Sequence, residues 1–263
     1  MNRLTMITAA AGLILASCAA LDATPPSKAP VATTPSSAGW TKPPPGYLAG
    51  GGDIDATVIL GPPPAPESPR GRAERKQFEE TRKLVNTPAW SQAIADADLS
   101  GKNGLKSFSC AAGVTLSAEA TPTLSSMLLR MTDDAAKIYQ PAKRAYQRPR
   151  PPVGNKAPIR EPWIQTDGSY PSGHGLIGWA WASVIAELVP EKASPVLARG
   201  KAFGDSRIIC GVHFQSDVEA GRYLGSALVT RLHDDPAFMA DLAKARGEVA
   251  ASKANGPPTG CGA

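Results

Sequence analysis

Apolar side chains recur along much of this chain at steps of three and four, which places them on one face of a helix. The clearest run follows Thr121-Pro122. Its apolar members are Leu124, Leu128, Met131, Ala135 and Ile138. We therefore predict an amphipathic helix here, which Pro141 is expected to kink or end. The period of two that is typical of strands is absent, so the pattern predicts an all-α fold.

Four further helices follow from local patterns. Residues 74–85 carry a few apolar side chains among many charges, which predicts a partly exposed helix. Asn86-Thr87-Pro88 offers a cap residue followed by proline at a first helical position. Residues 175–186 carry no charge on any side and are expected to be buried. Ser216-Asp217-Val218-Glu219 has the form of a capping box, which predicts a helix running towards Leu232.

The first quarter of the chain has a different composition. An apolar stretch after Arg3, from Met6 to Ala16, is too short to span a bilayer and is typical of a signal peptide. Twelve of the 26 prolines lie between Pro25 and Pro69, where little apolar surface is available to bury. The predicted regions are a signal peptide at 1–17, a tether at 18–68, a folded domain at 69–250 and a flexible tail at 251–263.

The signal peptide ends in Leu15-Ala16-Ser17-Cys18, which resembles the lipobox of bacterial lipoproteins. The resemblance implies that signal peptidase cuts before Cys18 and that acyl chains are attached to this cysteine. An ordinary signal peptide with a chance cysteine is the alternative. Ala19 and Ala20 lack the inner-membrane retention aspartate of the enterobacterial kind. The predicted location is therefore the periplasm of a Gram-negative bacterium, with a lipid anchor in the outer membrane.

Three cysteines remain after the predicted lipidation site, and the sequence does not show how they pair. They are Cys110, Cys210 and Cys261. In an oxidising compartment two of them are expected to form a disulfide while the third stays free.

The net charge of +5 suits an anionic substrate or surface and specifies neither. Walker-type phosphate loops, the Gly-x-Ser-x-Gly elbow and the dinucleotide fingerprint are absent from the sequence. The densest basic run contains Lys143, Arg144, Arg148 and Arg150. It fits a solvated face, a nucleic-acid patch or a phosphate site. The residues around His174 and His213 favour the phosphate site, and no nucleic-acid partner is predicted.

One of the three histidines, His174, lies in Pro171-Ser172-Gly173-His174, directly before the expected buried helix. Backbone N–H groups, a hydroxyl and the positive end of the helix dipole together suit a phosphate oxyanion. A histidine at this place can donate a proton. An ordinary helix cap beside a surface histidine explains the tetrapeptide equally well.

His213 lies four residues before Asp217, so one turn brings the carboxylate to the imidazole. The carboxylate would fix the tautomer and raise the nucleophilicity of the ring. The pair also fits half of a metal site, but no further histidine is near and no metal-ligand spacing is present. We therefore predict no metal and no other cofactor. His233 lies at an expected helix end, where a cation is favoured, and is interpreted as structural.

Three motifs, taken in order, resemble the type 2 phosphatidic acid phosphatase and vanadium haloperoxidase superfamily. They are Lys143-x6-Arg150-Pro151, Pro171-Ser172-Gly173-His174 and Ser206-Arg207-x5-His213-x3-Asp217. The stretches from Gly168 to His174 and from Ser206 to Asp217 resemble one branch most closely, the bacterial class A non-specific acid phosphatases.

The resemblance implies a helical bundle of the acid phosphatase and haloperoxidase type, with 69–250 as its catalytic domain. It implies a metal-independent acid phosphatase that hydrolyses phosphate monoesters of broad specificity through a phosphohistidine. His213 would be the nucleophile, Asp217 would orient it and His174 would protonate the leaving group. The phosphoryl oxygens would be held by Lys143, Arg150, Ser172, Gly173 and Arg207. The expected partners are small-molecule phosphate monoesters, the membrane through the anchor alone, and a second copy if the chain forms a homo-oligomer.

The sequence departs from this family pattern in two places. It offers two Arg-Pro pairs, Arg148-Pro149 and Arg150-Pro151, and the spacing from Lys143 selects Arg150. Residues 152–170 contain no cysteine that would accompany Cys210.

Three alternative functions remain open at this point. One is a lipid phosphatase, although no apolar run of about 20 residues follows the signal peptide. Another is a vanadate-dependent haloperoxidase that uses the same pocket. The third is a catalytically silent, anion-binding envelope lipoprotein, which would need none of the acid and nucleophile pairing.

Overall fold

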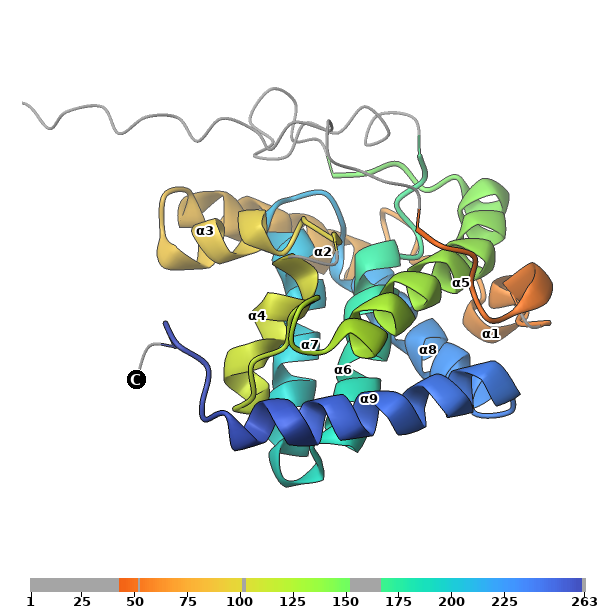
Figure 1. Cartoon of the computed structure of the whole chain (residues 1–263). Coiled ribbons are helices and arrows are strands. Elements are labelled where there is room, and N and C mark those ends of the chain that lie inside the picture. Colours follow the sequence, from red (N-terminus) through yellow and green to blue (C-terminus); the bar gives the residue numbers. More distant parts are fainter. Residues whose placement is uncertain (1–42, 52, 101–102, 152–166, 262–263) are drawn as a thin grey trace, which may run out of the picture. The chain divides into compact units, whose positions relative to one another are not determined.

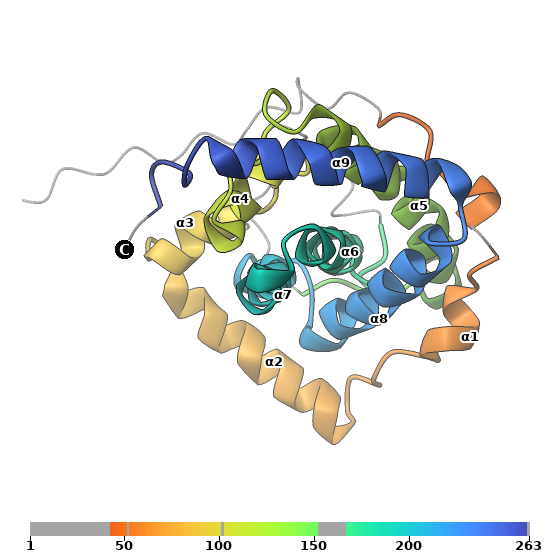
Figure 2. The same ribbon diagram turned by 60° about the horizontal axis from the view of Figure 1, so that its bottom comes forward.

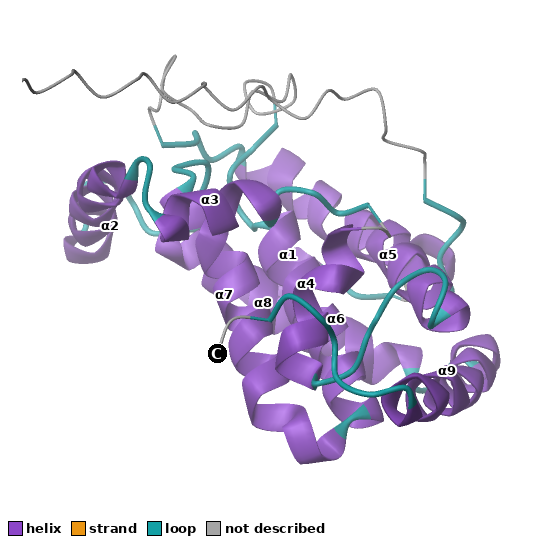
Figure 3. Ribbon diagram, turned by 60° about the vertical axis from the view of Figure 1, so that its left-hand side comes forward, coloured by secondary structure: helices purple, strands orange, loops and turns teal. Residues whose placement is uncertain are grey.

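The structure is a computed structural model that describes residues 43–51, 53–100, 103–151 and 167–261. Cys18, the signal peptide and most of the predicted tether lie outside these residues. Helices and loops, with no strand, make up the described ranges (Figure 3), so the prediction of an all-α fold is confirmed. Within the same ranges no helix combines the length and the apolar character needed to cross a bilayer.

The described part of the chain contains nine α-helices, of which α6 is the innermost (Figures 1 and 2). Their bounds are Ala56–Leu60 (α1), Pro69–Thr81 (α2), Pro88–Ala95 (α3), Asn103–Ala112 (α4), Pro122–Tyr146 (α5), Gly173–Leu188 (α6), Ala193–Ile209 (α7), Gln215–Leu232 (α8) and Pro236–Ala254 (α9). Short 3-10 turns lie at Ala49–Gly51, Arg82–Leu84 and Pro190–Lys192.

Helix α6 is buried over most of its surface, as its lack of charge predicted, and α5, α7, α8 and α9 pack against it. Trp179, Ser183 and Glu187 are only partly buried and mark its one open face. Its Trp181 is enclosed by the core and donates a hydrogen bond from the indole Nε1 to the carbonyl oxygen of Leu128 at 2.9 Å. Helix α8 approaches α6 closely because Gly221 has no side chain. A Cβ atom at that position would lie 2.4 Å from the carbonyl oxygen of Ser172. This close approach brings the beginnings of two helices together.

The helix that follows Thr121-Pro122 begins as predicted but does not end at Pro141. Helix α5 continues to Tyr146 and ends at Gln147, whose φ of 45° is left-handed. The final turn is held in place because Ala142 is buried in the core and Lys143 makes buried polar contacts. Proline inside a helix removes one hydrogen bond, and here tertiary packing outweighs that loss.

The capping box predicted over Ser216 to Glu219 is wrong, because the cap lies two residues earlier than Ser216 and α8 begins at Gln215. Phe214 is the cap residue, and the carboxylate that accepts its backbone N–H belongs to Asp217, at 2.8 Å. A carboxylate in the first turn still neutralises the exposed amides of the helix. The functional consequence is that this carboxylate lies inside the molecule, beside His213.

The folded core begins before residue 69, within the segment assigned to the tether. Tyr47 and Leu48 are buried, and their backbone N–H groups donate to the Asp134 carboxylate at 2.8 and 3.0 Å. The short helix α1 follows. Satisfying a fully buried carboxylate with two amides fixes this segment onto α5.

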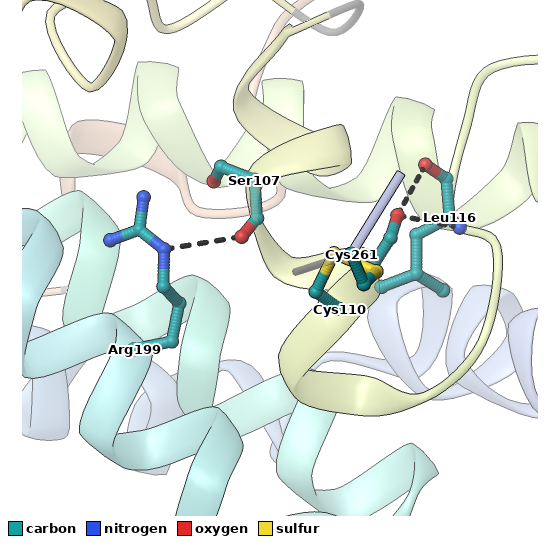
Figure 4. The surroundings of a disulfide bond; sticks show 6 residues. Ser107, Cys110, Leu116, Arg199 and Cys261 are labelled. Carbon is teal, nitrogen blue, oxygen red and sulfur yellow. Dashed lines mark hydrogen bonds between the residues drawn. A yellow bond between two sulfur atoms is a disulfide. The ribbon is translucent and has the colours of Figure 1, made fainter. Parts of the chain in front are cut away.

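The C-terminal segment is also tied down, because Cys261 forms a disulfide with Cys110 on α4 (Figure 4). The bond joins residues 151 positions apart, and closing so long a loop typically stabilises the fold by about 2–4 kcal/mol. Among the cysteines of the described residues, Cys210 forms no disulfide and is buried. A disulfide of this kind fits a protein exported to an oxidising compartment.

Candidate active site

The three motifs meet where α5 and α7 end and where α6 and α8 begin. The backbone N–H of Ser172 donates to the carbonyl oxygen of Asp217 at 2.9 Å, which joins the second motif to the third. Arg150 joins the first motif to the third, because its Nη1 lies 3.1 Å from Nε2 of His213. All eight predicted catalytic and phosphate-binding residues therefore come together. The predicted lipidation site, Cys18, lies outside the described residues.

His213 lies in the turn between α7 and α8 and is buried. Its Nδ1 lies 3.4 Å from Oδ2 of Asp217, and its Nε2 faces Nη1 of Arg150. A carboxylate beside Nδ1 favours a proton on that atom, and an arginine N–H beside Nε2 favours a lone pair there. We therefore assign the Nδ1–H tautomer. This tautomer leaves a lone pair on Nε2, which faces Arg150.

The Asp217 carboxylate is fully buried and accepts several hydrogen bonds. Arg148 donates to Oδ1 at 2.5 Å, while Ser169 Oγ and the backbone N–H of Phe214 donate to Oδ2 at 2.5 and 2.8 Å. Because so many donors fix the carboxylate, its orientation towards His213 is built into the fold. The sequence did not single out Ser169, and it placed Arg148 only within a basic run.

The phosphate-binding candidates form a cluster of buried cations. Nζ of Lys143 lies 2.9 Å from Oδ2 of Asp167 and 2.5 Å from the carbonyl oxygen of Gly168. Burial, followed by the charge of Arg150, lowers the pKa of Lys143 to about 8. Burial and the charge of Arg207 likewise lower the pKa of Arg150 to about 10. Cations that depress one another's pKa values are arranged to receive an anion.

His174 lies in the first turn of α6, which begins at Gly173 behind the cap residue Ser172. Its Nε2 lies 3.1 Å from the carbonyl oxygen of Ala97, and its ring stacks on Phe203 with centroids 6.3 Å apart. A Cβ at Gly173 would lie 2.9 Å from the ring of Tyr139, so only glycine fits between that ring and the helix start. The start of a helix presents backbone N–H groups that suit an anion.

Both histidines have pKa values well below the ordinary one. For His174 the causes are burial and then the charge of Arg207. For His213 they are burial and then the charges of Arg150 and Lys143. Both rings are therefore neutral near neutral pH before an anion enters. A neutral ring can act as a nucleophile, because one nitrogen keeps a free lone pair. A ring that acts as a general acid must first gain a proton, which a bound anion favours.

His233 lies at the end of α8, outside the site, as the sequence indicated. Its Nδ1 lies 2.8 Å from the carbonyl oxygen of Val229, and its Nε2 lies 3.0 Å from the carboxylate of Glu187. Across the described ranges, no three His, Cys, Asp or Glu side chains are close enough to share a metal ion.

Comparisons with known proteins identify one family model and several acid phosphatases that are similar to this chain. The PAP2 superfamily model matches residues 120–237. An acid phosphatase of Zymomonas mobilis is 39% identical over 200 residues, which cover 74% of this chain and 75% of the relative. A non-specific acid phosphatase of Providencia stuartii is 38% identical over 218 residues, covering 81% and 88%. One of Salmonella typhimurium is 37% identical over 201 residues, covering 74% and 80%.

Proposed function

Since this chain belongs to the PAP2 superfamily and is related over most of its length to bacterial non-specific acid phosphatases, we propose that it hydrolyses phosphate monoesters of broad specificity. The family resemblance read from the motifs is confirmed by these relatives, as is the prediction of an enzyme of the acid phosphatase class. The observation that carries the proposal is the position of His213, whose Nε2 faces the buried cations while its Nδ1 faces Asp217.

The reaction proceeds in two displacements. Nε2 of His213 attacks phosphorus, the bond to the leaving alkoxide breaks, and His174 gives its proton to the departing oxygen. Water then attacks the phosphohistidine and loses a proton to His174. The phosphorus–nitrogen bond breaks, its electron pair returns to Nε2, and inorganic phosphate leaves. Asp217 holds the Nδ1–H tautomer during both steps.

Phosphoryl transfer depends mainly on positioning and on stabilising charge on the equatorial oxygens. Lys143, Arg150 and Arg207 supply three positive charges, and the N–H of Gly173 adds an amide at the helix start. Ser172 Oγ accepts from the backbone N–H of Gly175 at 3.2 Å, which leaves its hydroxyl hydrogen for a phosphoryl oxygen. This set supports hydrolysis without a metal ion.

The same arrangement supports an acidic pH optimum. His174 has to carry a proton before the leaving group departs, and burial with Arg207 lowers its pKa. A dianionic phosphate beside the ring offsets those positive charges and raises this pKa in the complex. Activity then declines as rising pH removes the proton from His174.

The predicted location extends the proposal to the whole chain. We propose export by the signal peptide and attachment through Cys18 to the outer membrane, with the substrate reached from the periplasm. The disulfide between Cys110 and Cys261 supports an oxidising compartment. Small phosphate monoesters, not nucleic acid, are the proposed substrates. Homo-oligomerisation stays a prediction.

Hydrolysis of p-nitrophenyl phosphate from pH 4 to 9, with and without EDTA, tests the reaction. The variant His213→Ala is compared with His233→Ala, which removes a histidine outside the site. We expect acid activity that resists EDTA, is lost in the first variant and is kept in the second. An inactive wild type, or full activity in His213→Ala, would contradict the proposal. Loss of activity in EDTA would contradict metal independence alone.

A further inference from the structure

Helix α2 makes polar contacts with the first turn of α8 that the proposed mechanism does not use. Arg70, Glu74 and Gln77 follow at steps of four and three, so they share one face of α2. Their partners on α8 are the Glu219 carboxylate, the backbone N–H of Ser216 at 2.7 Å and the Gln215 side chain at 3.2 Å. Figure 2 shows α2 passing the beginning of α8. Helix α2 therefore supports the helix that carries Asp217.

Arg148 connects this contact to the active site. Its Nη2 donates to Oε2 of Glu74 at 2.7 Å, and its Nη1 donates to Oδ1 of Asp217 at 2.5 Å and to Oγ of Ser216 at 2.8 Å. The guanidinium also lies 4.4 Å from the centre of the Phe214 ring. The side chains of Glu74 and Asp217 are 4% and 0% exposed, so Arg148 joins two carboxylates that are almost completely removed from water.

We propose that Arg148, anchored by Glu74, is a positioning residue for the His213 nucleophile; this inference rests on the proposed phosphatase function. Arg148 holds Oδ1 of Asp217, which fixes the plane of the carboxylate and leaves Oδ2 for Nδ1 of His213. Without Arg148 the carboxylate keeps its donors at Oδ2, Ser169 and the backbone N–H of Phe214, but loses the guanidinium at Oδ1, so its hold on the His213 tautomer weakens.

The two arginines of the Arg-Pro pairs therefore have different tasks. Arg150 turns Nη1 to Nε2 of His213, on the side where phosphorus would be attacked. Arg148 lies on the opposite side of the imidazole. There its guanidinium nitrogens donate hydrogen bonds to the carboxylates of Asp217 and Glu74. Arg148 thus acts through Asp217 and does not touch the substrate. Its removal should change the chemical step more than substrate binding.

The test compares Arg148→Met, Arg148→Lys and Glu74→Gln with the wild type. Arg130→Met is the matched control, because Arg130 also pairs with a carboxylate, Asp241 at 3.1 Å, and covers a ring, Tyr47 at 3.4 Å. Each variant is assayed for kcat and KM with p-nitrophenyl phosphate, for inhibition by phosphate and by vanadate, and for Tm. Vanadate probes the nucleophile because it bonds to the attacking nitrogen, whereas phosphate reports on the cations.

For Arg148→Met we expect kcat to fall at least about tenfold, while KM and the phosphate inhibition constant change less than about threefold. The vanadate inhibition constant should rise in step with the loss of kcat. Arg148→Lys keeps one charge and should recover part of kcat, and Glu74→Gln should lie between it and the wild type. Arg130→Met should lower Tm alone.

Three results would overturn the inference. Unchanged kcat in Arg148→Met shows that Asp217 needs no such support. A raised KM and phosphate inhibition constant with kcat unchanged show that Arg148 binds substrate. Equal losses in Arg148→Met and Arg130→Met, following Tm alone, show a purely structural role. If Arg148→Met does not fold, Arg148→Lys and Glu74→Gln decide by the same criteria. An inactive wild type contradicts the proposed function instead.

Discussion

The two active-site histidines have different hydrogen-bond partners, although burial and neighbouring cations lower the pKa of both. Beside His213 the fold supplies a complete anionic support, in which the Asp217 carboxylate is held by Arg148 and Ser169. Beside His174 the hydrogen-bond partner is a backbone carbonyl, that of Ala97. The fold therefore prepares His213 for its proposed role as nucleophile. His174, the proposed acid, has no such support and has to receive its negative partner with the substrate.

This difference suits the two tasks. A nucleophile needs a free lone pair, and the low pKa of His213 keeps Nε2 unprotonated. A general acid needs a proton at the moment of bond cleavage, and the low pKa of His174 opposes this until an anion arrives. Substrate charge thus completes the site. Each of the following predictions removes or alters one side of this contrast.

The largest effect is expected from Asp217→Asn, which removes the anionic support of His213. An amide does not enforce the Nδ1–H tautomer, so kcat should fall by about 10³-fold or more. The control is Asp134→Asn, another fully buried aspartate, which accepts backbone amides of Tyr47 and Leu48 and should lower Tm while keeping kcat. The kcat for p-nitrophenyl phosphate measures both. Equal activity in the two variants would show that the fold does not prepare the nucleophile.

The next effect is expected from His174→Ala, and its size should depend on the leaving group. An alkoxide needs a proton to depart, so hydrolysis of an alkyl phosphate should fall by about 10²–10⁴-fold. The p-nitrophenolate ion leaves without a proton, so hydrolysis of its ester should fall much less. The ratio of the two kcat values measures the acid directly. An equal loss for both esters would show that His174 binds the phosphoryl group and donates no proton.

These two variants test residues that the sequence identified, because the chemistry lies in short local motifs. The partners of those residues were harder to find. Glu74 and Arg148 are 74 positions apart and meet only after α2 packs beside α8. Nothing in the charged pattern of residues 74–85 separates Glu74 from its solvated neighbours. Ser169 lies within the stretch from Gly168 to His174 that resembles the class A acid phosphatases, and that resemblance gave it no separate role.

The helices likewise differ in how clearly the sequence indicates them. Helix α5 was predicted from its regular apolar stripe, and α6 was predicted from its lack of charge. Helix α7 was missed because its contact with α6 uses small residues. A Cβ added at Gly200 would lie only 2.2 Å from the Cβ of Ala182. Such an interface leaves no apolar stripe to detect. Helix α9 does carry an apolar stripe, although it is not among the predicted helices. Its members are Phe238, Leu242, Ala245 and Val249.

The pH profiles of kcat/KM and kcat should show that His174 has a lower pKa in the free enzyme than in the substrate complex. Burial and Arg207 lower the pKa of His174 in the free enzyme, and bound phosphate dianion opposes this and raises it. Loss of the acid form with rising pH should therefore begin at lower pH in kcat/KM than in kcat. Both profiles are measured with an alkyl phosphate. Coinciding alkaline limbs, or an alkaline optimum alone, would contradict completion of the acid by the substrate.

The smallest effect is expected from Asp167→Asn, which removes a negative charge from beside the active-site cations. The Asp167 carboxylate lies 2.9 Å from Nζ of Lys143 and 3.7 Å from Nη2 of Arg150, so it competes with a phosphate dianion for their charge. Its neutralisation should lower the inhibition constant of inorganic phosphate by about three- to tenfold. Asp205→Asn, which also removes a carboxylate paired with a lysine and an arginine, should leave it unchanged. Weaker phosphate binding in Asp167→Asn would instead show that Asp167 holds Lys143 in place. The protein would then position the phosphate-binding cations as well as the proposed nucleophile.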